Sequence, residues 1–146
     1  MQNIHSAIVL FHIICGAISL LLFWGPCFTK KGGKQHKKVG NVYLATMTLT
    51  SVSGVVSSSL VLLAPLLIFP TMPAHFESVE YFLAYLQGQY IFLLMLSLLV
   101  WNNVRHAKRV LEVKVNRGEL RKVKYLWLPT ALFVVASIAL YQGIKY

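Results

Sequence analysis

The amino-acid sequence predicts an all-α integral membrane protein, built as a bundle of four transmembrane helices. Three observations predict this fold class. The chain is 57% hydrophobic and only 12% charged, whereas soluble domains carry about 25% charged residues. Four apolar runs approach or exceed the roughly 20 residues that a helix needs to cross a bilayer. Thirteen of the fourteen Lys and Arg lie between these runs, in residues 30–38 and 105–124.

The first apolar run covers residues 7–26, and the second covers about 39–68. The first is followed, not preceded, by basic residues, which is the reverse of the charge order of a signal peptide, so we expect a spanning helix. The second is longer than a span requires, so we expect its first turns at the membrane interface or a tilted helix. Pro65 and Pro70 mark its end.

The third run covers residues 81–101 and carries aromatic side chains at both ends, as expected at the two interfaces of a bilayer. The polar stretch 102–124 is expected to extend this helix on the cytoplasmic side and then to turn at Gly118. The fourth run covers residues 125–143. Pro129 lies near its start, where proline is tolerated because the first turn lacks backbone hydrogen-bond partners.

The distribution of charge predicts the orientation of the bundle. Five Lys lie in the predicted loop 27–38 and eight Lys or Arg in the predicted loop 102–124, whereas residues 69–80 carry two Glu and no basic residue. By the positive-inside rule, the two basic loops face the cytoplasm and both termini lie on the outer side. Short connections make neighbouring helices antiparallel, so residues 1–146 are predicted to form one up-down-up-down bundle.

The basic stretch KKGGKQHKKVGNVY, residues 30–43, is interpreted as an anchor on the membrane surface. Attraction to anionic lipid contributes about 1 kcal/mol per basic residue. A nucleic-acid-binding module would need a soluble scaffold with interleaved basic and aromatic residues, so we expect the lipid bilayer and no nucleic acid as the partner. The lipid-surface candidates are Lys30, Lys31, Lys34, Lys37 and Lys38.

Polar side chains inside the predicted spans are the candidates for function. His12 is the only histidine well inside a span, and an ionisable residue at that depth is a functional candidate by default. A neutral imidazole hydrogen-bonded to a neighbouring helix explains it equally well. Several polar residues are expected at the same depth, and they would form a pocket for a quinone headgroup, a small ligand or water, or simply interhelical hydrogen bonds. They are Ser57, Ser58, Gln87, Gln89 and Tyr90.

A second candidate site is expected at the cytoplasmic surface, where His36 begins the second run and His106 follows the third. Haem b in a membrane usually needs two axial ligands at one depth on facing helices, and His12 has no second histidine at its level. Two histidines alone make an incomplete metal site, so no metal is predicted. His5 and His75 are expected to be exposed in the outer flanking segments.

Small residues predict close packing of the second helix. Thr50, Gly54 and Ser58 recur every four residues, a pattern that lets helices approach each other closely, and Gly16 offers the same feature on the first helix. The pattern fits packing within the bundle, a homodimer or a larger partner. The many hydroxyl groups of this helix also fit a solute path.

Part of the sequence resembles a known group of proteins. The pattern runs through His12-xxx-Gly16, Gly25-Pro26, Lys31-Gly32 and His36-xxx-Gly40-Asn41-Val42-Tyr43. It resembles a family of bacterial predicted membrane proteins of unknown function, in which a first-helix histidine is followed by a glycine-rich basic loop. The resemblance covers about residues 8–60, and the second half of the family pattern is poorly matched. It implies a multi-pass protein of the bacterial inner membrane, with the outer side facing the periplasm.

These observations lead to one main hypothesis and two alternatives. The main hypothesis is a small non-enzymatic membrane protein, acting as a homo-oligomer or as a subunit of a larger membrane complex. The first alternative is a redox protein that binds haem b or quinone near His12, or near His36 and His106. The second is a small-solute channel or transporter. The chain has no Asp, and all four Glu lie outside the predicted spans, which disfavours carboxylate-driven transport.

Overall fold

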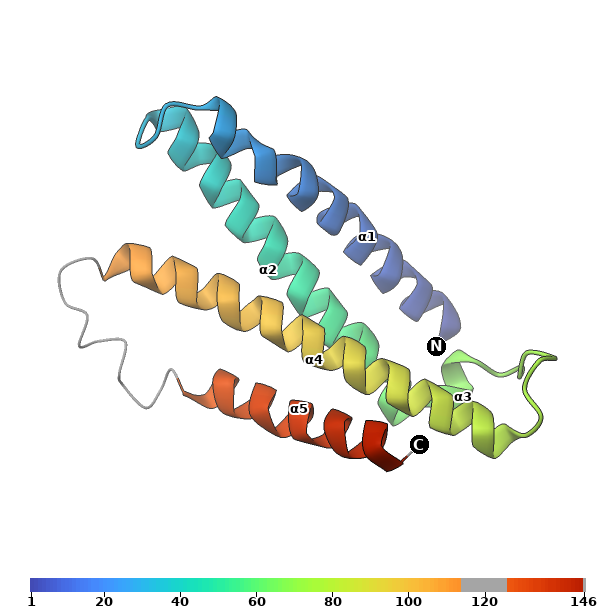
Figure 1. Cartoon of the computed structure of the whole chain (residues 1–146). Coiled ribbons are helices and arrows are strands. Elements are labelled where there is room, and N and C mark those ends of the chain that lie inside the picture. The colour runs from blue at the N-terminus through green and yellow to red at the C-terminus, as the bar shows by residue number, and fades with distance from the viewer. Residues whose placement is uncertain (114–125, 146) are drawn as a thin grey trace.

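The structure, a computed structural model, describes residues 1–113 and 126–145. All regular secondary structure in this part of the chain is helical, as the sequence predicts. The long helices are α1 (Gln2–Trp24), α2 (Lys34–Leu63), α4 (Val79–Glu112) and α5 (Trp127–Lys145), and the short ones are η1 (Gly25–Phe28) and α3 (Pro65–Ile68). Figure 1 shows the long helices side by side in chain order, each running opposite to the one before it.

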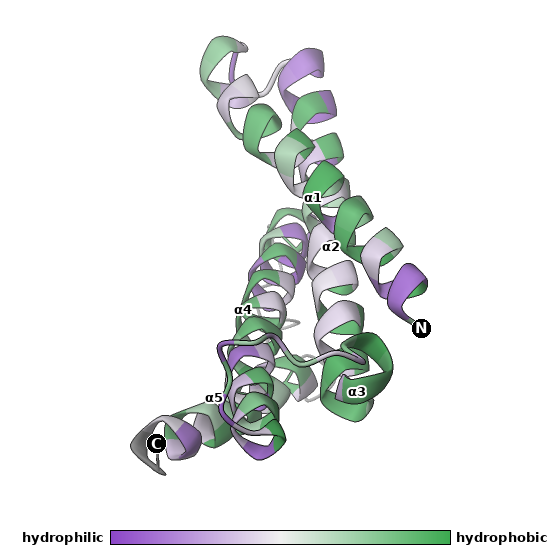
Figure 2. Cartoon of the chain, turned by 90° about the vertical axis from the view of Figure 1, so that its right-hand side faces the viewer, coloured by the Kyte–Doolittle hydropathy of each residue, from purple (hydrophilic) through white to green (hydrophobic). Residues whose placement is uncertain are grey.

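The helices meet the requirements of a membrane bundle to different degrees. By length and composition, three helices of the described chain could cross a membrane: α1 with η1, α2 and α4. The apolar part of α5, Trp127–Gly143, is shorter. In Figure 2 hydrophobic ribbon dominates α1, and hydrophilic segments lie near its N-terminus and around the α1–α2 turn. The architecture is therefore compatible with a helical membrane bundle.

The second predicted helix is divided by proline. α2 ends at Leu63, and Pro65 then opens the single turn of α3. Ala64 between them has φ −145° and ψ 62°, because a residue before proline is driven out of the helical region. The helix also begins at Lys34 rather than at Val39, so three lysines of the basic anchor lie on its first turns.

The connection between α1 and α2 is shorter than predicted and depends on glycine. Gly32 has φ +79°, in the left-handed region that other residues rarely adopt. A side chain on Gly33 would approach the backbone oxygen of Lys30 to 2.9 Å. The tight turn therefore needs both glycines.

The polar stretch after the third run is largely part of a helix. α4 continues through residues 102–112 to Glu112, which agrees with a helical extension. The turn expected at Gly118 lies outside the described residues. At its other end α4 begins after Ser78, whose hydroxyl accepts a hydrogen bond from the backbone nitrogen of Tyr81 at 3.2 Å.

Three helices meet most closely at Gly54, which is buried on α2. A methyl group on Gly54 would overlap the hydroxyl oxygen of Ser97 on α4 and come within 3.2 Å of Cε1 of His12 on α1. Gly16 on α1 is less crowded, since its added methyl would make an ordinary contact of 3.7 Å with Thr50. Gly54 and Ser58 of the predicted small-residue pattern are thus placed between helices, with Thr50 beside them facing α1.

Gly54→Leu is expected to destabilise the bundle, because the larger side chain must displace Ser97 and His12. Overpacking of this kind typically lowers the free energy of unfolding by about 1–3 kcal/mol. The matched control is Gly40→Leu on the same helix, where an added Cβ meets nothing within 4 Å. Thermal unfolding in mild detergent should give a lower midpoint for Gly54→Leu and an unchanged or higher one for Gly40→Leu. Equal midpoints would contradict the close approach at Gly54.

Candidate functional site

A line of polar side chains joins α1 to α2, and we call it the polar seam. On α1 it consists of residues seven apart, which therefore lie on one stripe of the helix after every two turns. Their partners on α2 run in the opposite direction. The polar seam comprises His5, His12 and Ser19 on α1, with Thr46, Thr50, Ser53 and Ser57 on α2.

His12 occupies the middle of the polar seam. Its Nδ1 lies 2.9 Å from the backbone oxygen of Thr50 and 3.1 Å from the hydroxyl oxygen of Ser53. The Ser53 hydroxyl donates to the same Thr50 oxygen at 2.9 Å. Because a carbonyl oxygen only accepts, Nδ1 carries the proton and donates it. This geometry fits an imidazole that is hydrogen-bonded to a neighbouring helix, one of the two interpretations of His12.

Ser19 forms the next contact toward the basic end. Its hydroxyl oxygen lies 2.8 Å from the Cys15 backbone oxygen and 2.8 Å from Oγ1 of Thr46. Both Cys15 and Ser19 are buried. Thr46 in turn lies 3.1 Å from the backbone oxygen of Val42.

Several hydroxyl groups of α2 bond to their own helix. Thr48, Thr50 and Ser51 each donate to a backbone oxygen three or four residues earlier, at 2.7–2.9 Å. Each of these hydroxyl groups has a single proton, which these bonds engage. These three hydroxyl groups of the face predicted as a possible solute path therefore bond within α2, and the solute path itself stays a prediction.

At the end away from the basic α1–α2 turn, the polar seam ends in an aromatic group, the His5 cluster, made of His5, Ser57, Phe69 and Tyr90. His5 is only 7% exposed, and its Nε2 lies 3.0 Å from the Ser57 hydroxyl. The His5 ring meets Phe69 and Tyr90 edge-on, with ring centroids 6.0 Å and 6.4 Å away. The expectation that His5 is exposed was wrong, because α1 begins at Gln2 and packs His5 against α2 and α4. His75 is exposed as expected.

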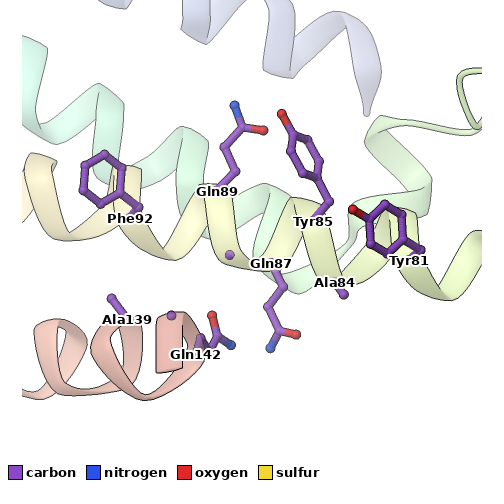
Figure 3. Close-up of a pocket in the computed structure, with 10 residues that line it drawn as sticks. Tyr81, Ala84, Tyr85, Gln87, Gln89, Phe92, Ala139 and Gln142 are labelled. Atoms are coloured by element: carbon purple, nitrogen blue, oxygen red, sulfur yellow. The ribbon is translucent and has the colours of Figure 1, made fainter. Parts of the chain in front are cut away.

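The residues predicted to share a pocket with His12 are divided among three places. Ser57 and Tyr90 belong to the His5 cluster, and Ser58 is buried on α2 at 3% exposure. Gln87 and Gln89 lie on α4 and are among the lining residues of a cavity beside α5; Gln87 is directed toward α5 and Gln89 away from it (Figure 3). The structure thus brings His12 together with Thr50 and Ser53 and leaves the two glutamines elsewhere.

His36 and His106 are also placed apart. Nδ1 of His36 lies 3.2 Å from Oγ1 of Thr29 within the α1–α2 turn. The contact of Gly54 with Ser97 sets the antiparallel register of α2 and α4, and this register puts His106 level with Ala45. Ala45 is nine residues from His36, about 14 Å along the helix. Among the described residues no group of three or more His, Cys, Asp or Glu could hold a metal ion.

The basic residues gather at one end of the molecule. The five lysines of residues 30–38 are all exposed around the α1–α2 turn, and Figure 1 places the end of α4 on the same side. There the guanidinium of Arg105 lies 5.1 Å from the ring centroid of Trp127, and Trp101 packs edge-on against Trp127 at 5.7 Å. These contacts join α4 to the start of α5.

The cavity lined by Gln87 and Gln89 lies between α4 and α5, near the end opposite to the basic residues, and we call it the α4–α5 cavity (Figure 3). Its volume is about 460 Å³. Sequence reasoning identified only two of its lining residues, because the others are tyrosines, small residues and a glutamine spread over two separate runs. The lining consists of Tyr81, Ala84, Tyr85, Gln87, Gly88, Gln89, Phe92, Ala139, Gln142 and Gly143.

His12→Ala is expected to weaken the α1–α2 contact, because it removes the bonds to Thr50 and Ser53. Interhelical hydrogen bonds in membranes contribute about 0.6–2 kcal/mol, so the free energy of unfolding should fall by that order. Equilibrium unfolding in mixed detergent micelles would measure it. His106→Ala, at an exposed position on α4, is the control and should change stability by less than about 0.5 kcal/mol. Equal effects of the two variants would argue against the polar seam.

Comparison with known proteins adds no further constraint. No protein-family model, curated protein or solved structure matches this chain. The resemblance of residues 8–60 to bacterial membrane proteins of unknown function therefore stays a prediction, and the function has to be argued from the site itself.

Proposed function

We propose that the protein is a small non-enzymatic protein of the bacterial inner membrane, acting as a homo-oligomer or as a subunit of a larger membrane complex. The observation that carries this proposal is the polar seam. Its imidazole and hydroxyl groups are paired with each other and with backbone oxygens, which is the arrangement of groups that hold helices together. The described polar-seam residues include hydroxyl–imidazole pairs but no carboxylic acid, so a full set of nucleophile, base and acid for catalysis is not present there.

The arrangement of charge supports an orientation with both basic connections in the cytoplasm. The exposed lysines of the α1–α2 turn and the basic end of α4 lie at one end of the bundle. The connection that carries Glu77 lies at the other end, with both chain termini (Figure 1). Under the positive-inside rule this supports a periplasmic location for both termini. We include α5 as the fourth span, beginning near its exposed Trp127, an aromatic residue suited to the interface.

The wide apolar face of α1 supports an assembly in the membrane. α1 lies at the edge of the bundle, and only three of its residues are buried: His5, Cys15 and Ser19. Large apolar side chains on the rest of its surface are exposed, among them Leu10, Phe11, Ile14, Leu21 and Phe23. A helix with this pattern is surrounded by lipid or by another protein chain. In the proposed oligomer or complex, a neighbouring chain would cover part of this apolar surface of α1.

The orientation can be tested with single-cysteine variants. The first variant is Cys15→Ala, which leaves the exposed Cys27 as the single cysteine, next to the α1–α2 turn. The second variant adds Cys27→Ser and His75→Cys, so that its single cysteine lies in the connection after α3. A membrane-impermeant maleimide should label the His75→Cys variant in intact cells. It should label Cys27 only after the membrane is opened or inverted. The reverse pattern would overturn the proposed orientation, because the basic loops would then lie outside.

The assembly can be tested by native mass spectrometry after gentle extraction. We expect a discrete homo-oligomer, or this chain together with a second membrane protein in fixed ratio. Crosslinking in intact membranes, before extraction, is the control for assemblies that detergent dissociates. A strictly monomeric chain in both measurements, with no co-purifying protein, would contradict the proposed function.

A further inference from the structure

The α4–α5 cavity has the dimensions of a ligand site. Its volume of about 460 Å³ falls within the roughly 300–1,000 Å³ of small-molecule pockets. It opens between the outer halves of two helices, starting from the first turn of α4, which begins at Val79, and lying close to the end of α5 at Lys145. Figure 3 shows Gln87 directed from α4 toward the side of α5 and Gln142 directed from α5 toward α4.

The chemistry of the lining selects a neutral ligand. Among the described residues that line the α4–α5 cavity there is no Lys, Arg, Asp, Glu or His. The polar groups are the phenols of Tyr81 and Tyr85 and three side-chain amides, and the remaining lining atoms are apolar or backbone. A charged group placed here would lose its hydration without a counter-charge. A mainly apolar molecule with a few hydrogen-bonding atoms fits this lining.

The shape of the lining selects a flat ring. The side chains of Tyr81, Tyr85 and Phe92 provide aromatic surfaces against which a planar ring can pack. Small residues lie four apart on both helices, Ala84 with Gly88 on α4 and Ala139 with Gly143 on α5. A Cβ built on Gly88 or on Gly143 meets nothing within 4 Å. The small residues therefore keep space open between helices instead of bringing the helices into contact.

Gln142 supplies an independent sign of an incomplete hydrogen-bond network. Its Oε1 is buried and has no hydrogen-bond partner in the described part of the chain. A buried acceptor without a donor is unfavourable. Rotation about the last side-chain bonds of Gln142 would present its amide to a molecule in the cavity. Its N–H₂ would then donate to a ring carbonyl, or its oxygen would accept from a ring hydroxyl.

We propose that the α4–α5 cavity is a binding site for the ring of a membrane quinone or its quinol. Such a molecule is neutral, planar and mostly apolar, and it carries two oxygens that match the amide and phenol groups. Its chain would extend between the helices into the lipid. The site is separate from His12, where the polar seam engages the polar groups, and it goes beyond the proposed role as a membrane subunit. The proposal concerns binding and includes no electron transfer.

The test uses the full-length protein in lipid nanodiscs and two short-chain probes, menadione and ubiquinone-1. Equilibrium dialysis should show saturable binding of at least one probe. Gly88→Leu fills the cavity and should weaken that binding by at least about tenfold, the loss expected when packing space and a hydrogen bond disappear together. Gly40→Leu introduces the same side chain into open space on α2 and should leave binding unchanged.

Further variants separate a binding defect from a folding defect. Gly88→Leu should match Gly40→Leu in thermal midpoint, since leucine is the better helix former at both positions. Gln142→Leu keeps the size of the side chain and removes its amide, and should weaken probe binding by severalfold. If Gly88→Leu fails to fold, the test rests on Gln142→Leu alone. An unchanged affinity of this variant for the probe would then overturn the proposed site.

Two other outcomes would overturn the proposal. The first is no saturable binding of either probe to the wild-type protein in nanodiscs. The second is displacement of the bound probe by farnesol as effectively as by unlabelled quinone. Farnesol has an isoprenoid chain and no ring, so its competition would show that the cavity accommodates lipid chains in general. None of these outcomes depends on the oligomeric state, so a failure of the quinone site and a failure of the proposed assembly can be distinguished.

Discussion

The contact of His12 with Thr50 and Ser53 beside Gly54 is the interaction on which the bundle depends. Inside a bilayer the lipid is as apolar as the helix surfaces, so burial of apolar side chains does not by itself drive helices together. Close packing and hydrogen bonds must do so. At Gly54 the two coincide, because the absent side chain lets α1 and α4 approach the same point of α2. The rest of the polar seam aligns α1 with α2 on either side of this point.

Much of the fold could be predicted from the sequence, because it follows from local rules. Apolar length predicts the three longest helices, proline predicts the end of α2, and paired glycines predict the first turn. The observed helix boundaries differ from the predicted ones where hydropathy misleads. α2 begins within a lysine-rich stretch whose low hydropathy predicts a loop. Lysine is a good helix former, and its charge does not prevent a helix from extending beyond the membrane surface.

The arrangement of the site was less predictable, because it depends on which helix faces are paired. Counting depth along each span brought His12 together with Ser57 and Tyr90, but the register of α1 and α2 instead gives these partners to His5. The seven-residue spacing of His5, His12 and Ser19 was visible in the sequence and would have indicated one continuous stripe. The α4–α5 cavity had no comparable pattern, since its lining is divided between two runs separated by a long polar segment.

The spacing of the polar seam also restricts how the first hairpin can change in length. A strict repeat of seven residues is slightly shorter than two turns of a straight helix, so two helices that keep it wind gently around each other in a left-handed sense. One residue inserted between His5 and His12 would rotate His5 by about 100° around α1 and turn it from α2 toward lipid. A change of seven residues would keep His5 on the same face but shift it by about 10 Å along α1, out of reach of Ser57. Any insertion or deletion in this part of α1 therefore breaks the contact of His5 with Ser57, whereas the exposed connection after α3 has no such restriction.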